Sequence, residues 1–458
     1  MSNAKISLIS HASILIQIDD KKIVTDPWYF GETFNNGWEL SPKPNLEKIK
    51  LQLRDADIIW ISHEHPDHLH FPTLKWLVEI IDKNVTIYFQ KTNSIKVFSA
   101  LKKLGYKSFV QMPHMKKITI TPKVKIACYA HRHLDSALAV FINNKMWLLN
   151  INDTALSTND CSLILKKFGN PCVIYNQFSI AGSNGIEKSL KINASNILSR
   201  MTSQHKELKA KLTVPFASFI RFARTDNTYM NPYANSIKDV QNEFKKTNLN
   251  LCVQRYEREA LEWTDAESLP INWQRINSNN DCQLIDDNIE DIDTHNYTVV
   301  SESELKSTIE SKIREWHNVT NPLIWKLFKF QKITLFIYDL GKQIWEIDFN
   351  RCLFYKKFET KEADIKIASQ PLHQAFKTPF GIQTLGVSGR YKFSEEFEDV
   401  PRTWKKIRIL SSLFNAEIYF NLRSLFSVKT INWIWFRRKG LLNQILQQVK
   451  RFKSNLDA

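Results

Sequence analysis

A cluster of metal-binding side chains follows one apolar run in this chain. The apolar residues 58–61 come after Asp57, and an apolar run bounded in this way predicts a buried strand. The polar turn that follows carries four candidate ligands: His63, His65, Asp67 and His68. Imidazole nitrogens and carboxylate oxygens are ligands that zinc and iron accept. The spacing therefore predicts a metal site, because a solvated histidine-rich turn would not explain why the cluster ends a strand and precedes a predicted helix.

Two later segments carry further candidate ligands. His131 and His133 have the same facing if their segment is extended, so either of them could reach a metal. Asp153 follows a strand predicted over 145–151, where a carboxylate could bridge two metals. Such a residue alone would more often cap a helix, but the upstream histidines favour the ligand interpretation.

The elements that must position these residues alternate between strands and helices. Short strands are expected at 6–9, 13–18, 22–25 and 85–89, helices at 45–54, 74–81 and 94–104, and a β-rich stretch at 117–150. This order predicts a layered α/β sandwich. The aromatic segment 29–38, which ends at Trp38, is expected to be either a loop folded over the site or a packed surface loop.

The next part of the chain contains a short glycine-rich segment. Gly182 and Ser183 follow a strand expected at 172–175, and backbone N–H groups there could cradle a phosphate, although an ordinary turn also explains them. A long helix over 187–208, a strand over 212–215 and a helix over 234–245 come next. We expect a first domain over 1–265, an acidic linker over 266–300 and an α+β domain over 301–458.

Composition restricts the setting of the protein. With 43% hydrophobic and 24% charged residues, the sequence is typical of a globular protein, and no apolar run approaches the roughly 18 residues that span a bilayer. The N-terminus lacks the pattern of a cleavable signal, and the six cysteines are scattered, which fits a reducing, cytoplasmic compartment. The net charge of +16 favours an anionic partner.

The combination of motifs resembles a known family. The His-x-His-x-Asp-His turn, the later histidine and the strand-end aspartate are similar to the metallo-β-lactamase superfamily, which implies an αββα sandwich with two metals. Residues 25–28, the Gly37-Trp38 loop, residues 61–68 with 72–75, and residues 214–217 further resemble the catalytic domain of CMP-N-acetylneuraminate hydroxylases.

The resemblance implies roles for individual residues. It selects His131 over His133, so that His63, His65 and His131 would hold one metal, and Asp67 with His68 the other. Asp153 would lie between them, and Asp67 and Asp153 are the candidate catalytic carboxylates. Trp38, Gly182 and Ser183 are candidate substrate contacts.

The sequence departs from that family in two respects. It has no Rieske iron–sulfur domain, so an oxygenase would need a separate electron-transfer protein. Arg224 stands where the last metal-ligand histidine is expected, and a guanidinium has no lone pair for a cation. The second metal site would then be weakened, or supplied by Asp226 or His205, while Arg224 would bind an anionic group of the substrate.

The C-terminal part shows other patterns. Its strands and helices are weakly similar to sterol-carrier-like domains, which would bind an apolar ligand, but a packing or dimerisation module is the favoured interpretation. The tail is basic and aromatic, with Trp433, Trp435 and Phe436 among many lysines and arginines. It could contact an anionic membrane surface, or be a solvated basic face; no motif indicates nucleic-acid binding.

Three functions are consistent with the sequence. The resemblance favours an iron monooxygenase that hydroxylates an N-acyl nucleotide sugar, such as CMP-N-acetylneuraminate, or a related anionic substrate. The first alternative is a zinc hydrolase of a phosphodiester, lactone or amide, in which the metal lowers the pKa of bound water. The second is a ligand-binding protein with a degenerate site. The ligand types alone do not separate iron from zinc.

Overall fold

The computed structural model describes most of the chain in two compact units. The described residues are 3–415 and 419, apart from 82–83, 93, 132–134, 257, 279–297, 342 and 358–361. His133, the acidic run of the expected linker and the aromatic part of the basic tail lie outside the described residues. Unit 1 comprises Met1–Ser183, Glu187–His295 and Val387–Gly389, and unit 2 comprises Asn184–Ile186, Asn296–Gly386 and Arg390–Ala458.

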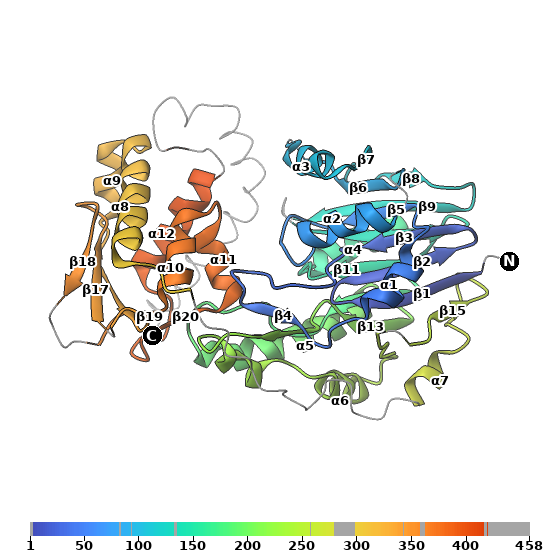
Figure 1. Ribbon diagram of the computed structural model, residues 1–458. Coiled ribbons are helices and arrows are strands. Elements are labelled where there is room, and N and C mark those ends of the chain that lie inside the picture. The colour runs from blue at the N-terminus through green and yellow to red at the C-terminus, as the bar shows by residue number, and fades with distance from the viewer. Residues whose placement is uncertain are drawn as a thin grey trace. The chain divides into compact units, whose positions relative to one another are not determined.

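Unit 1 contains two main β-sheets (Figure 1). The first has seven strands in the order β15 (Leu261–Trp263), β1 (Ala4–Ser10), β2 (Ser13–Ile18), β3 (Lys21–Thr25), β5 (Ile58–Ile61), β6 (Thr86–Gln90) and β7 (Ser108–Met112). The second has six strands in the order β13 (Leu212–Phe216), β12 (Val173–Gln177), β11 (Lys145–Asn152), β10 (Asp135–Ile142), β9 (Val124–His131) and β8 (Lys117–Thr119). Strands β3, β5, β6 and β7 run parallel to one another, as do β11, β12 and β13.

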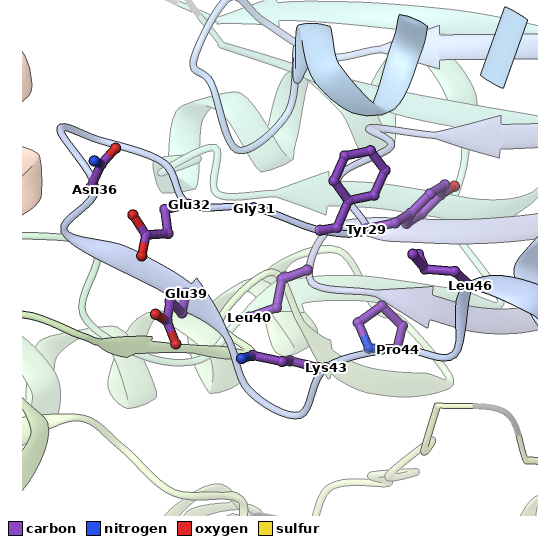
Figure 2. Close-up of a pocket in the computed structure, with 10 residues that line it drawn as sticks. Tyr29, Gly31, Glu32, Asn36, Glu39, Leu40, Lys43, Pro44 and Leu46 are labelled. Atoms are coloured by element: carbon purple, nitrogen blue, oxygen red, sulfur yellow. The ribbon is translucent and has the colours of Figure 1, made fainter. Parts of the chain in front are cut away.

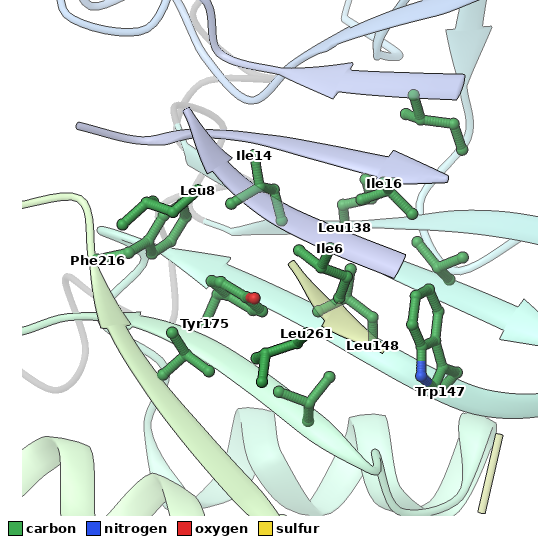
Figure 3. Packing of buried hydrophobic residues seen from close by; sticks show 14 of the residues in the cluster. Ile6, Leu8, Ile14, Ile16, Leu138, Trp147, Leu148, Tyr175, Phe216 and Leu261 are labelled. Atoms are coloured by element: carbon green, nitrogen blue, oxygen red, sulfur yellow. The ribbon is translucent and has the colours of Figure 1, made fainter. Parts of the chain in front are cut away.

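The space between the two sheets is filled by aliphatic and aromatic side chains. Figure 3 shows Ile6, Ile14 and Ile16 of the first sheet near Leu138 and Leu148 of the second. All five are almost fully buried. Alternation along each strand places one row of side chains in this core and the next row on the outer face.

Helices cover the outer faces of both sheets. Residues from α1 (Leu46–Leu53), α2 (Phe71–Ile80) and α3 (Lys96–Leu104) share a core with the outer face of the first sheet, and α4 (Thr158–Phe168) shares one with the second. The remaining helices of unit 1 are α5 (Lys188–Glu207), the 3-10 helix η1 (Thr228–Tyr233), α6 (Ile237–Thr247) and α7 (Trp273–Ser278). This helix–sheet–sheet–helix arrangement is the αββα sandwich that the sequence predicts.

Two segments show how unit 1 is completed. Trp273 and Ile276 of α7 pack against the inter-sheet core, so the first unit continues past the expected boundary at residue 265. The late segment Val387–Gly389 also belongs to unit 1. Its Val387 carbonyl accepts a hydrogen bond from Trp38 Nε1 (3.1 Å), and its Ser388 carbonyl accepts one from Asn227 Nδ2 (2.8 Å).

Unit 2 is built on a five-stranded sheet. Its order is β18 (Leu353–Lys357), β17 (Gln343–Asp348), β16 (Ile333–Ile337), β19 (Ile365–Ile367) and β20 (Tyr391–Phe393). The helices are α8 (Glu302–Val319), α9 (Pro322–Phe328), α10 (Ser369–Lys377), α11 (Gly381–Ser388) and α12 (Arg402–Asn415). The mixture agrees with the expected α+β class. Among all helices that the structure describes, none is both long and apolar enough to cross a membrane.

Candidate metal centre

The metal turn lies at the carboxyl end of a central parallel strand. Strand β5 pairs with β3 on one side and β6 on the other, so residues after β5 emerge beside the residues after β3. Asp26, directly after β3, accepts a hydrogen bond from the Ser62 backbone N–H through Oδ1 (2.7 Å). The His65 carbonyl accepts hydrogen bonds from the backbone N–H groups of His68 (3.0 Å) and Leu69 (2.7 Å), which close the turn tightly. The turn therefore holds its side chains within a few ångströms of one another.

Seven side chains converge there in three overlapping sets of possible metal ligands. In each set the three ligand atoms lie within 4.8 Å of one another. The sets are His63, His65 and Asp135; His63, His68 and Asp153; and His11, Asp67 and His68. Each set consists of two imidazoles and one carboxylate.

The distances between ligand atoms suit metal coordination. His63 Nε2 lies 3.5 Å from Asp153 Oδ2 and 3.8 Å from Asp135 Oδ1. His68 Nε2 lies 3.1 Å from Asp67 Oδ2 and 3.6 Å from Asp153 Oδ2. Donors that each lie about 2.0–2.2 Å from one ion are separated by roughly 3.0–3.5 Å in tetrahedral or octahedral geometry. Small adjustments of these side chains would therefore place them around metal ions.

Neighbouring polar groups orient two of the imidazoles. His68 Nδ1 lies 3.1 Å from Asp26 Oδ2, and His63 Nδ1 lies 2.9 Å from Ser62 Oγ. Asn152 Nδ2 donates a hydrogen bond to the same oxygen of Asp26. A metal-bound histidine usually has its second nitrogen fixed by such a partner. These contacts leave both Nε2 atoms facing the carboxylates.

Several buried atoms at this edge have no hydrogen-bond partner within the protein. They include Asp67 Oδ1, Asp153 Oδ1 and the Nδ1 atoms of His11 and His131. Buried polar atoms are nearly always satisfied, so a group of exceptions in one place indicates a ligand that would use some of them. The donor types and these unsatisfied atoms fit metal ions.

The electrostatics of the cluster couple metal binding to protons. Burial lowers the pKa of His63 well below its usual value, and His68 and His65 add to the effect. Burial also disfavours the charged form of His68, but Asp67, Asp153 and Asp26 outweigh it and raise the pKa of His68 well above its usual value. Burial likewise opposes ionisation of Asp67, yet His68 and His11 hold its pKa well below the usual range. A metal at His68 would therefore displace a proton.

His131 lies beside this cluster with a different partner. Its Nε2 is 3.5 Å from Asp160 Oδ2, and Asp160 also accepts a hydrogen bond from Tyr129 OH (2.6 Å). Asp160 is the third residue of α4, where it forms a capping box with Ser157. His131 is not a member of the three donor sets, and the nitrogen left to face a ligand is the unsatisfied Nδ1. Asp135, which pairs with His131 across β9 and β10, provides the carboxylate of the first set.

The aromatic loop lies over the imidazoles. The Phe34 ring is 5.9 Å from the His65 ring, and the Trp38 ring is 6.3 Å from the His11 ring. Phe34 and Trp38 contact each other at 4.5 Å. Of the two interpretations of segment 29–38, the structure therefore agrees with a loop folded over the site.

Arg224 does not lie among the donors in these sets. Its guanidinium forms an ion pair with Glu32, and its Nε donates to the Asn36 carbonyl (2.6 Å). This arginine therefore ties the strand-connecting segment after β14 (Ile220–Phe222) to the aromatic loop. His205, a considered substitute ligand, is hydrogen-bonded to Thr213 Oγ1 through Nδ1 (2.8 Å), and Asp226, the other candidate, is also absent from the three sets.

The glycine-rich segment has a packing role. Ser183 is almost buried and receives a long hydrogen bond from Tyr229 OH (3.5 Å), and Gly182 has a positive φ of 133°. Gly185 belongs to unit 2, where its carbonyl accepts from the Phe393 N–H (2.9 Å). A Cβ atom at Gly185 would come within 2.6 Å of the Phe393 ring. This close approach explains a glycine there without a phosphate.

A cavity of about 530 Å³ lies beside the aromatic loop (Figure 2). Its lining includes Glu32, Glu39 and Lys43, together with the apolar side chain of Phe30. Glu32 is paired with Arg224, and Glu39 forms an ion pair with Arg221 (2.7 Å). No residue of the three donor sets lines this cavity, so it is separate from the candidate metal centre.

Two members of the donor sets, His11 and Asp135, were not anticipated from the sequence. His11 interrupts the apolar pattern between the first two strands. The sequence shows this histidine position but does not indicate which other ligands it would meet. Asp135 lies four residues after His131, close to candidates that had been recognised. For His11 the missing information was which strand ends of the first sheet lie close together, and for Asp135 it was which strand ends meet across the two sheets.

Comparison with known proteins agrees with this fold. Residues 5–157 match the model of the beta-lactamase superfamily domain, and the two sheets with their outer helices form a metallo-β-lactamase-type sandwich. Residues 5–157 are thus similar to this superfamily's domain, and the histidine turn of the candidate metal centre lies inside the matched segment.

The sequence relatives are more specific. The chain is 37% identical over 117 residues to the cytidine monophosphate-N-acetylneuraminic acid hydroxylase of Asterias rubens. This alignment covers 26% of this chain and 17% of that protein. It is 39% identical over 103 residues to the Xenopus laevis hydroxylase, covering 22% of this chain and 17% of the relative. The matches thus span about a sixth of the length of these curated relatives.

Solved structures show more distant similarity. Igni18, a metallo hydrolase from Ignicoccus hospitalis, is 15% identical with a TM-score of 0.42 and covers 57% of this chain and 99% of its own. CmlA, a diiron beta-hydroxylase from Streptomyces venezuelae, is 11% identical with a TM-score of 0.40 and covers 57% of this chain and 54% of its own.

Proposed function

We propose that unit 1 is a metal-dependent oxygenase that uses two iron ions to hydroxylate an anionic N-acyl nucleotide sugar, such as CMP-N-acetylneuraminate, or a related compound. The observation that carries this proposal is the convergence of seven nitrogen and oxygen donors in three sets of two imidazoles and one carboxylate. Two histidines and one carboxylate are the ligands of many non-haem iron oxygenases. The local similarity to hydroxylases supports the same reaction class.

A zinc hydrolase is the second candidate. Two histidines and a carboxylate also hold catalytic zinc in metalloproteases, so the donor types support both metals. When bound, iron would supply activation of dioxygen, whereas zinc would supply an activated water. The sequence similarity to hydroxylases supports our preference for iron.

The protein's own residues would bind and shield the substrate. Phe34 and Trp38, whose rings lie 5.9 Å from the His65 ring and 6.3 Å from the His11 ring, would exclude water from one side of the imidazoles. Arg200 on α5 donates to Gln177 Oε1 (3.3 Å) at the end of β12. Burial lowers the pKa of Arg200, and the negative charge of Asp153 counteracts this, which indicates that Arg200 faces the same edge. Arg200 is therefore our candidate for binding a phosphate or carboxylate of the substrate, a role that the sequence had suggested for Arg224.

This proposal includes a separate electron donor and a cytoplasmic setting. The net charge of +16 favours anionic ligands generally, and it does not select one. Any contact of the basic aromatic tail with a membrane surface remains a prediction from the sequence.

Metal analysis joined to an oxygen assay tests the proposed function. Protein purified from its native host should contain two iron atoms per chain. With a chemical reductant and CMP-N-acetylneuraminate, it should consume dioxygen and form a hydroxylated product detected by mass spectrometry. His63→Ala is the matched control, because His63 belongs to two donor sets, and it should abolish the substrate-dependent consumption.

The opposite result would identify the hydrolase. Two zinc atoms, no substrate-dependent oxygen use and release of CMP from the same substrate would contradict the oxygenase proposal. Full metal loading without either reaction would favour a ligand-binding role.

A further inference from the structure

His11 occupies a buried corner between two strands of the first sheet. It lies between β1 and β2, is 2% exposed, and its carbonyl accepts a hydrogen bond from the Ala217 N–H (2.7 Å). The Trp28 ring lies 5.4 Å from the His11 ring and packs edge-on. The backbone contact and the indole together fix the direction of this imidazole.

The His11 ring points toward the metal turn. Its Nε2 lies 3.4 Å from Asp67 Oδ2, which in turn lies 3.1 Å from His68 Nε2. These separations match the roughly 3.0–3.5 Å expected between donors that share one ion. All three residues are less than 5% exposed, and Asp67 Oδ1 has no hydrogen-bond partner.

We infer that His11 is a ligand of the second metal and takes the place that the sequence comparison left to Arg224. This inference rests on the proposed metal centre and adds a specific ligand to it. His63, His65 and Asp135 would hold the first ion, and His11, Asp67 and His68 the second. Asp153, which lies 3.5 Å from His63 Nε2 and 3.6 Å from His68 Nε2, is then placed between the two ions.

This arrangement removes the reason to expect a weakened second site. Each ion obtains two imidazoles and one carboxylate of its own. Arg224 is already engaged by Glu32 and the Asn36 carbonyl, so the site does not depend on a histidine at that position. A competing explanation is that His11 only donates a hydrogen bond to Asp67 and so positions it.

Two substitutions at His11 separate ligation from positioning. His11→Gln keeps an N–H donor for Asp67 but provides a poor metal ligand. His11→Glu, when ionised, provides a metal ligand but no donor. His205→Gln is the control, since His205 is a buried histidine of the same unit that contacts Thr213.

The measurement is zinc stoichiometry and affinity in the full-length apoprotein, by calorimetry with Zn²⁺ alone and by elemental analysis after dialysis. We expect two equivalents in the wild type, His11→Glu and His205→Gln. His11→Gln should bind one equivalent normally and the second at least tenfold more weakly. The retained first equivalent and an unchanged circular dichroism spectrum would show that the variant folds.

Other results have distinct meanings. Two normal equivalents in His11→Gln would overturn the inference. If His11→Glu also lost the second equivalent, the pair of results would show that His11 acts by positioning Asp67. A wild type that binds no metal would instead refute the proposed function itself.

Discussion

Both units contain buried carboxylate oxygens, but the two units differ in whether these oxygens have hydrogen-bond partners within the protein. In unit 2, Glu346 is 4% exposed and accepts hydrogen bonds from Lys332 Nζ (2.7 Å) and from Tyr355 OH. Glu310 accepts from the Phe354 N–H (3.1 Å) and from Arg314 (3.0 Å). Among the described residues, the buried carboxylate oxygens that lack any partner, Asp67 Oδ1 and Asp153 Oδ1, both belong to unit 1. A buried carboxylate that stabilises the fold has hydrogen-bond partners within the protein, whereas a carboxylate that binds a ligand has an oxygen without such a partner.

Metal removal should have the largest effect on stability, and this loss of stability should be confined to unit 1. A ligand that binds only the folded state stabilises it by about 4 kcal/mol at a free concentration of 1,000 Kd. We therefore expect chelation to lower the thermal unfolding temperature of unit 1 by several degrees. Hydrogen exchange followed by mass spectrometry would assign the change to segments of each unit. Equal loss of protection in both units would contradict the comparison.

Removing one carboxylate from each unit should produce opposite effects on the apoprotein. Glu346→Ala removes the carboxylate to which both Lys332 and Tyr355 donate, leaving these two hydrogen-bonded only to each other, and should lower the free energy of unfolding by about 1–3 kcal/mol. Asp153→Asn removes a partly buried negative charge near Asp135 and should leave that free energy unchanged or higher, while both ions bind more weakly. Urea denaturation with and without Zn²⁺ measures both.

The exposed pair Glu302–Lys356 is a suitable control for this experiment, because Glu302→Ala should change stability by less than about 0.5 kcal/mol. Substantial destabilisation of the apoprotein by Asp153→Asn would show that Asp153 is part of the fold's own stability.

A smaller effect should appear as a pH dependence of unit 1. Burial and the charge of Asp153 raise the pKa of Asp135 to about 6, compared with roughly 3.9 in an unfolded chain. The stability that this group gives the apoprotein is therefore present below about pH 3.9 and lost as the pH rises through about 6. Metal binding needs the ionised carboxylate, so zinc affinity should rise through the same interval.

Calorimetric zinc titration between pH 5 and pH 7 would measure this dependence. Asp135→Asn should bind zinc more weakly and lose the part of the slope centred near pH 6. An unchanged slope in that variant would assign the proton to another group, such as His68.

The local parts of the fold could be predicted from the sequence. The strand before the metal turn was expected at 58–61 and is observed at Ile58–Ile61, and the helix expected at 94–104 is observed at Lys96–Leu104. Apolar periodicity and turn residues encode such elements directly. The αββα class followed from their order and from the family resemblance.

The complete donor sets required information that is not local. His11 and Asp67 are far apart in sequence, and their contact depends on how β2 and β3 place the β1–β2 corner beside the end of β5. In the same way, the pairing of Arg224 with Glu32 could not be read from either segment alone. Spacing identifies ligands on one turn, whereas tertiary packing selects those from other strands.

The segment Val387–Gly389 has a consequence for synthesis of the protein. The Val387 carbonyl that accepts from Trp38, and the Ser388 carbonyl that accepts from Asn227 in addition to the Gly37 carbonyl, belong to residues that leave the ribosome more than 100 residues after α7. During translation, the indole N–H of Trp38, whose ring lies near His11, therefore cannot form its hydrogen bond to Val387 until most of unit 2 has been synthesised. A nascent chain would therefore pass through a stage in which the strands of both sheets have been synthesised but Trp38, beside the histidine cluster, is not yet held by Val387.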